Sequence, residues 1–236
     1  MKNLAVTGLV AAIILSGCSE SNSAHGSASP EVTAKTSTSL IEASPKHNAA
    51  GDSTEETFFL NKTLGWKAVY HFQGMAREDM ELYQTKNAGR DWKKISDSSQ
   101  SGSTLPGGVK SGFVFTSGTE GWITANAPWQ GKIGLFKTND GGVSWSEVPL
   151  IVPDLLSTAQ IRVGPPLFLS ENLGILLTRP DAADHTLLYI TKDGGQSWKS
   201  FVDNASGEYS GITWSISEGV MNVKYDNKTL SISVPD

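Results

Sequence analysis

The sequence predicts an all-β protein built from repeated units of four short strands. Three octapeptides of nearly the same composition carry this prediction, and each starts 53 residues after the one before it; they occupy residues 85–92, 138–145 and 191–198. An apolar stretch precedes each octapeptide, and a glycine followed by a large apolar residue stands further upstream. A fixed period of this size indicates that one supersecondary unit has been copied.

Each octapeptide has the composition of a tight hairpin turn. An Asp or Asn side chain can accept hydrogen bonds from backbone amides about two residues on, and a glycine supplies the positive φ that a tight hairpin needs. A tryptophan then begins the next strand. In chain order these residues are Asn87, Gly89 and Trp92, then Asp140, Gly142 and Trp145, and finally Asp193, Gly195 and Trp198.

The repeat extends upstream of the octapeptides. Residues 58–66, 113–122 and 167–175 share an apolar strand, a polar turn, a glycine and a large apolar residue. Gly121 and Gly174 each lie 17 residues before the next octapeptide, whereas the gap in the first copy is 20, so we expect a three-residue insertion near residues 74–77. Each complete copy then contains four short strands, which is the content of one propeller blade.

A fourth, degenerate copy ends the chain. Residues 212–217, 219–225 and 229–234 have strand patterns, but no octapeptide accompanies them. The total is about fifteen strands, one short of four blades, and atypical terminal units are expected in repeat proteins. We therefore predict a small or incomplete β-propeller of about four blades, three of them with octapeptides. Two outcomes stay open: a closed ring of four blades, or an open stack of sheets.

The octapeptide resembles the Asp-box, or BNR repeat, whose form is Ser/Thr-x-Asp-x-Gly-x-Ser/Thr-Trp/Phe. The second and third copies match every defined position, whereas the first has Asn87 and Asp91 at two of them, so its turn is expected to be less tightly capped. The resemblance is to the sialidase-like and photosystem II stability factor-like β-propeller superfamily. In such proteins the box lies between the outer two strands of a blade and has a structural role away from the ligand face.

The N-terminus predicts a lipid anchor. A short basic start, an apolar run over residues 4–14 and the sequence Leu-Ser-Gly-Cys ending at Cys18 are typical of a bacterial lipoprotein signal peptide. Residues 1–17 are the predicted signal peptide, and its lipobox resemblance implies that Cys18 is acylated. Residues 18–56, without Phe, Trp or Tyr, are the predicted disordered linker, and residues 57–236 the propeller-like domain. The expected location is the outer face of the cell membrane, or the outer membrane.

Composition excludes some partners. The chain has 24 acidic and 19 basic residues and no run of Lys or Arg, so nucleic acid is a poor candidate. With one Cys and four His that stand apart in the sequence, neither a metal site nor a cofactor is expected.

Catalysis is not expected. The resemblance to sialidases would require an arginine triad, a Tyr nucleophile with a Glu partner and an Asp acid/base on six blades. This chain has four arginines, and Arg90 lies inside an octapeptide turn. The favoured function is a non-catalytic scaffold that binds a protein or an envelope glycan, with Trp129 and Tyr209 as candidate contact residues because blade packing does not account for them. A small BNR-type glycoside hydrolase is the alternative.

Overall fold

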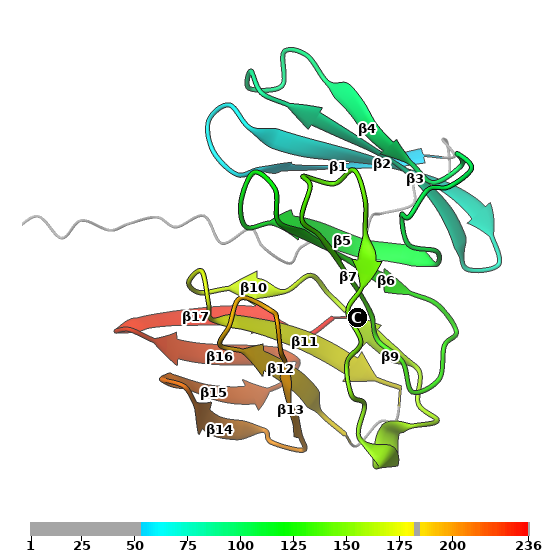
Figure 1. Cartoon of the computed structure of the whole chain (residues 1–236). Helices are drawn as coiled ribbons and strands as arrows, with labels where there is room; N and C mark the ends of the chain where they lie inside the picture. The colour runs from blue at the N-terminus through cyan, green and yellow to red at the C-terminus, as the bar shows by residue number, and fades with distance from the viewer. Residues whose placement is uncertain (1–52, 182–184, 236) are drawn as a thin grey trace, which may run out of the picture. The chain divides into compact units, whose positions relative to one another are not determined.

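The computed structural model describes residues 53–181 and 185–235, which form four antiparallel sheets (Figure 1). Sheet 1 consists of β1 (Ser53–Phe59), β2 (Gly65–Gly74), β3 (Arg77–Thr85) and β4 (Lys93–Asp97). Sheet 2 consists of β5 (Val109–Phe115), β6 (Gly121–Asn126), β7 (Gly134–Thr138) and β8 (Ser146–Glu147). Sheet 3 consists of β9 (Ile161–Val163), β10 (Leu167–Phe168), β11 (Gly174–Pro180), β12 (Leu187–Thr191) and β13 (Lys199–Val202). Sheet 4 consists of β14 (Ser206–Tyr209), β15 (Ile212–Ser217), β16 (Val220–Tyr225) and β17 (Lys228–Ser233).

The prediction of an all-β fold is confirmed for these residues, whose only helical element is the 3-10 turn η1 (Asp154–Leu156). In each sheet the strands follow one another in chain order, except that β9 and β10 both pair with β11 and together fill one strand position. The four sheets do not close into a ring.

Two details of the predicted organisation were wrong. Strand β1 begins at Ser53, inside the predicted linker, because residues 53–56 pair with β2 in register with the rest of the strand. The fourth copy also has a first strand, β14, which the count of about fifteen strands omitted. Its sequence, Ser-Gly-Glu-Tyr, has a single strand-favouring residue and no apolar alternation by which a strand could be recognised. The predicted signal peptide, Cys18 and most of the linker lie outside the described residues.

The extra residues of the first copy lengthen the β2–β3 hairpin. Its turn is made by Met75 and Ala76, both with positive φ (49° and 59°), and a bulge lies between Phe72 and Gly74. The insertion expected near residues 74–77 therefore lies at the tip of this hairpin.

Three apolar clusters join the sheets in chain order. The first, around Trp66 and Phe115, joins sheets 1 and 2; the second, around Trp122 and Leu176, joins sheets 2 and 3. The third, around Ile175 and Trp214, joins sheets 3 and 4. Each of sheets 2 and 3 is therefore covered on both faces, whereas sheets 1 and 4 each have one face outside these clusters.

The octapeptides form three turns with one hydrogen-bond framework, each between the third and fourth strand of its sheet. The hydroxyls of Thr85, Thr138 and Thr191 donate to the Oδ1 atoms of Asn87, Asp140 and Asp193 at 3.0, 2.7 and 2.8 Å. The same hydroxyls accept from the amides of Gly89, Gly142 and Gly195 at 2.9, 3.0 and 2.8 Å. The Asp and Asn residues thus act as turn caps.

The first turn keeps this framework in spite of its two substitutions. In the second turn the Ser144 hydroxyl donates to Asp140 Oδ2 at 2.5 Å, and Ser197 donates to Asp193 in the same way. In the first turn the direction is reversed, since Asn87 Nδ2 donates to the carboxylate of Asp91 at 2.7 Å. The expectation of a less tightly capped first turn was therefore wrong: donor and acceptor have exchanged places, and the bond is kept.

The two aspartate caps predict acid sensitivity. Partial burial alone would raise the pKa of Asp140 and Asp193, but hydrogen bonds from Ser144 and Ser197, together with those from threonine hydroxyls and backbone amides, outweigh it and lower both values to about 2. Because these pKa values lie below the value of 3.8 for a free aspartate, the stability they contribute is complete above that value and is lost as the pH falls toward 2.

We therefore expect a double variant, Asp140→Asn with Asp193→Asn, to lose less thermal stability than the wild type between pH 5 and pH 2.5. Asparagine keeps the Oδ1 acceptor, as Asn87 shows in the first turn, but has no carboxyl to protonate. Melting temperatures followed by circular dichroism across this range test the prediction. Parallel pH profiles of the two proteins would contradict it.

Candidate functional site

An aromatic pair occurs at the same place in the first three sheets. A phenylalanine at the end of the first strand position lies opposite the glycine that opens the next strand, and the octapeptide tryptophan meets its ring edge to face. The pairs are Phe59–Trp92, Phe115–Trp145 and Phe168–Trp198, with ring centroids 6.0, 6.1 and 6.3 Å apart. Together with the turn glycine beside it, each pair forms what we call a socket.

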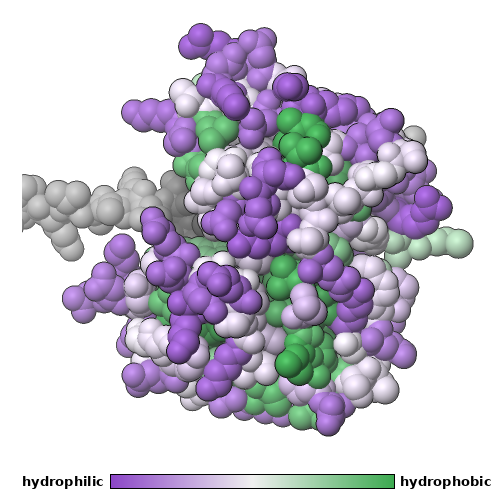
Figure 2. Space-filling model, viewed as in Figure 1, coloured by the Kyte–Doolittle hydropathy of each residue, from purple (hydrophilic) through white to green (hydrophobic). Residues whose placement is uncertain are grey.

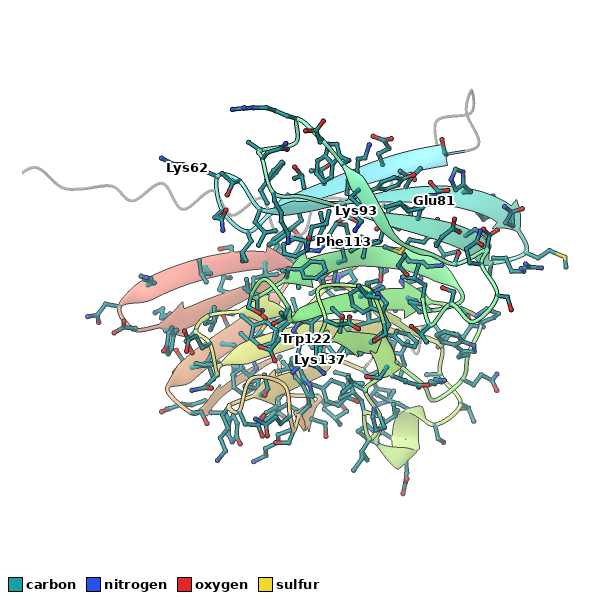
Figure 3. All side chains as sticks on the ribbon, turned by 45° about the horizontal axis from the view of Figure 1, so that its top comes forward. Lys62, Glu81, Lys93, Phe113, Trp122 and Lys137 are labelled. Carbon is teal, nitrogen blue, oxygen red and sulfur yellow. The ribbon has the colours of Figure 1, made fainter. Side chains whose placement is uncertain are left out.

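The sockets of sheets 2 and 3 are filled by the preceding sheet. Trp66 of sheet 1 stacks on Phe115 with centroids 3.7 Å apart and planes 4° apart, and its indole N–H donates to the carbonyl of Gly141 at 2.9 Å. Trp122 of sheet 2 lies on Phe168 and meets Trp198 edge to face, at 5.6 and 6.0 Å. Figure 3 shows Trp122 beside Lys137, whose ammonium lies 5.0 Å from the ring centre.

Among the residues that the structure describes, no sheet precedes the socket of sheet 1. Phe59 is 45% exposed, whereas Phe115 is 2% exposed in the equivalent position. Trp92 is half-buried, against Phe59 and its own turn. The socket belongs to the outer face of sheet 1, by which we mean the side chains of Phe59, Lys67, Glu81, Tyr83, Trp92 and Lys94.

Cations and aromatic rings alternate on this face. The ammonium of Lys67 lies 5.4 Å from the ring centre of Tyr83 and 5.6 Å from that of Trp92. The ammonium of Lys94 lies 5.7 Å from the ring centre of Tyr83. Such contacts stabilise aromatic rings that remain partly exposed to water, because each cation is attracted to the negative face of a ring.

Ion pairs lie beside Tyr83 on this face. Lys94 contacts Glu81 at 2.5 Å and Asp97 at 3.1 Å, and the Tyr83 hydroxyl donates to Glu81 at 2.5 Å. The hydrogen bond from Lys94, followed by that from Tyr83, lowers the pKa of Glu81. Exposed pairs of this kind contribute little to stability. An aromatic centre with a charged rim is, however, the usual anatomy of a protein interface.

Figure 2 shows hydrophobic residues in separate patches between hydrophilic ones on the visible side. On sheet 1, Figure 3 labels Glu81 of β3 and Lys93 of β4. The outer face of sheet 1 contains both aromatic and charged side chains.

The two predicted contact residues lie elsewhere. Trp129 is half-buried and folds back over its own sheet, where its ring would meet a Cβ on Gly134 at 2.9 Å; the Lys132 ammonium lies 5.0 Å from the ring centre. Tyr209 packs on Phe201 of β13 at 5.3 Å, with the ammonium of Lys199 at 4.7 Å. Contacts within the domain thus cover part of the surface of both side chains. The structure does not place Trp129 and Tyr209 in one common site.

A buried polar cluster lies between sheets 1 and 2. The Tyr70 hydroxyl donates to Glu56 at 2.7 Å, and burial raises the pKa of both groups. Lys110, 1% exposed, donates from Nζ to the carbonyls of Glu78 and Gly108 at 2.6 and 3.0 Å, and burial lowers its pKa to about 8.

The Tyr70–Glu56 pair has the residue types of a sialidase nucleophile, but Tyr70 is 2% exposed. A phenol buried in this way has no access to a sugar. The cluster instead joins β1, β2, β3 and β5 by hydrogen bonds.

No model of a known protein family matches the chain, and no curated protein matches it. Among the residues that the structure describes, no helix has the length and apolar character needed to cross a membrane.

Sequence reasoning missed Phe59, Lys67 and Tyr83. Each follows the ordinary alternation of a half-buried strand, and nothing local distinguishes Phe59 from Phe115 or Phe168. The usable signal is the spacing of a phenylalanine six residues before a glycine, which all three copies share, combined with the position of the first copy at one end of the stack.

Proposed function

We propose that this chain is a non-catalytic, extracytoplasmic binding protein, anchored through Cys18, whose repeat domain is an open propeller-like stack of four blades. Four successive antiparallel sheets support the blade assignment, as does the place of the three octapeptide turns between the third and fourth strands. The partner is a protein or an envelope glycan, and it is bound through the outer face of sheet 1.

The observation that carries the proposal is the exposed aromatic pair at the end of the stack. Large aromatic side chains in partly open positions supply binding energy in interfaces, because they bury much apolar area at little entropic cost. Sheet 1 retains the aromatic pair that sheets 2 and 3 use for packing, although nothing in this stack covers it. We conclude that something outside the stack covers it.

The alternative glycoside hydrolase has less support. Such enzymes need two carboxyl groups that face each other across an accessible cleft. Glu56 is a carboxyl group with a raised pKa, but it is paired with a buried tyrosine in the interior. Glu81 of the outer face and Asp97, which both pair with Lys94, have lowered pKa values and are therefore poor general acids at neutral pH.

Site-specific photo-crosslinking in intact cells tests the binding surface. A photoreactive amino acid at Thr57, which pairs with Lys67 on the outer face, should crosslink a defined envelope component. The same amino acid at Thr213, on the polar face of sheet 4, should not. We expect Phe59→Ala to reduce the crosslink at least five-fold and Phe72→Ala, equally exposed at 46% on the same sheet, to leave it unchanged.

Equal crosslinking from both positions would contradict the proposed surface. Turnover of an envelope glycan by the purified protein would instead favour the hydrolase.

The anchor is tested separately. The variant Cys18→Ala should move from the membrane fraction to the soluble fraction, because acylation needs the thiol and two or more acyl chains are required for stable anchoring. Retention of this variant in the membrane fraction would contradict acylation at Cys18.

A further inference from the structure

We infer that the socket of sheet 1 binds a tryptophan side chain presented by a partner protein, in the way that the sockets of sheets 2 and 3 bind Trp66 and Trp122. This inference rests on the proposed binding function and names the chemistry of its partner. The chain itself supplies the precedent, because the same socket is present three times and is filled twice by tryptophan.

The turn beside the socket is built like its occupied counterparts. The amide of Ala88 donates to the carbonyl of Thr63 at 3.0 Å, and Gly141 and Gly194 make the same bond to Thr119 and Asn172 at 2.8 and 2.9 Å. The backbone of Ala88 also has positive φ (63°), as Gly141 has (78°) and Gly194 has (67°). The Ala88 carbonyl therefore occupies the position of the Gly141 carbonyl.

That carbonyl is the acceptor of the indole N–H in the occupied socket of sheet 2. Trp66 donates to Gly141 at 2.9 Å, whereas Trp122 fills the socket of sheet 3 by ring contacts without such a bond. An incoming tryptophan in the socket of sheet 1 has the Ala88 carbonyl as the equivalent acceptor. Ring packing is the common element, and the hydrogen bond is an addition.

The rest of the outer face is modified for contact with water. The strand position of Lys67 is held by Ile123 in sheet 2 and Leu176 in sheet 3, both fully buried. The cross-strand neighbour is aromatic in all three sheets, as Tyr83, Phe136 and Tyr189. One aliphatic position has thus become a lysine while the aromatic positions are kept, as expected of a surface that is sometimes uncovered.

The chain's other end does not supply the missing side chain. The outer face of sheet 4 consists mainly of small polar residues, which alternate with the buried residues of the third apolar cluster: Thr213, Ser215, Asn222, Lys224, Thr229 and Ser231. A second copy of this chain, docked through that face, would present hydroxyls to the aromatic pair. The occupant is therefore a different protein that exposes a tryptophan.

A glycan fits the socket less well. Sugars stack on a flat aromatic face and need hydroxyl partners around it, whereas Phe59 and Trp92 meet at 61° and present one face and one edge. The nearby lysines are already paired with carboxylates: Lys94 with Glu81 at 2.5 Å and Lys67 with Glu55 at 3.7 Å. A saccharide is nevertheless included in the test as a competing ligand.

The test is a titration of the full-length protein with N-acetyl-L-tryptophanamide, followed by NMR at the indole N–H of Trp92 and the amides of Ala88 and Gly89. We expect saturable shifts at these positions, and at least five-fold weaker binding to Phe59→Ala than to Phe72→Ala or to the wild type. N-acetyl-L-leucinamide should bind at least five-fold more weakly, because it lacks the ring and the N–H donor.

Two results would overturn the inference: no saturable shift with the tryptophan derivative, or shifts at the same positions with a chito-oligosaccharide and not with the tryptophan derivative. Its failure is distinguishable from failure of the proposed function. A crosslink that depends on Phe59 without tryptophan binding would keep the surface and reject this ligand, whereas no crosslink from Thr57 would reject the surface itself.

Discussion

Replacing Gly195 by alanine is expected to lower the free energy of unfolding by about 2–5 kcal/mol. A Cβ at this position would lie 2.3 Å from Cη2 and 2.6 Å from Cζ2 of Trp122, which is buried between sheets 2 and 3. Overpacking of a rigid core costs about 1–3 kcal/mol. The positive φ of 79° at this residue adds a penalty of about 1–2 kcal/mol for a residue with a Cβ.

Gly89→Ala is the matched control, because Gly89 is the same turn position in sheet 1. Its φ is also 79°, but its nearest neighbour is the ring of Trp92, at 3.4 Å from an added Cβ. It should therefore lose only the backbone contribution, about 1–2 kcal/mol. Urea denaturation of both variants measures the difference; equal losses would contradict the view that octapeptide turns wedge against the preceding sheet.

Trp66→Ala is expected to cost about 3–5 kcal/mol, the range for removing a large aromatic side chain from a core. Trp66 has no exposed surface, stacks on Phe115 and donates to the Gly141 carbonyl. Trp66→Phe should retain most of the stack and lose about 1–3 kcal/mol, because the buried carbonyl is deprived of its donor.

Amide hydrogen exchange, measured separately for each sheet, shows which sheets the Trp66→Ala variant destabilises. In a linear stack each unit contacts only its neighbours, so Trp66→Ala should increase exchange in sheets 1 and 2 more than in sheet 4. Uniform acceleration in all four sheets would show instead that the stack unfolds as a single cooperative unit.

Much of the fold follows from local sequence. The period of the octapeptides, the glycine before each second strand and the insertion in the first copy all predicted features that the structure contains. These features depend on hydrogen bonds and alternation within a few residues, which is why a single sequence reveals them. The two errors at strand level have the same origin, since β14 and the start of β1 lack strong apolar alternation.

The capping of the first turn was misjudged for a related reason. Asn87 and Asp91 each depart from the repeat, and considered one at a time each weakens the turn. In the structure they compensate each other, because the amide of one donates to the carboxylate of the other. Pairs of substitutions are understood only when the contact between them is known.

The candidate site depends on contacts between residues that lie still further apart in the sequence. Trp129 and Tyr209 were selected because no blade position accounts for them, and both prove to pack against their neighbours. The residues of the outer face were not selected, because each has a regular strand position whose equivalents in sheets 2 and 3 belong to the interior.

The sequence by itself therefore determined the repeated unit, its strands and its octapeptide turns, since backbone hydrogen bonding and side-chain alternation are local. Only the tertiary structure decided which sheet faces are covered. Phe59 and Phe115 each lie six residues before a Gly-Trp pair and have the same register against the glycine, yet one is exposed and the other buried. The difference comes from Trp66 of the neighbouring sheet, which stacks on Phe115 and not on Phe59. Whether a side chain is buried thus depends on which sheet packs against its own, and the sequence of one strand does not contain that information.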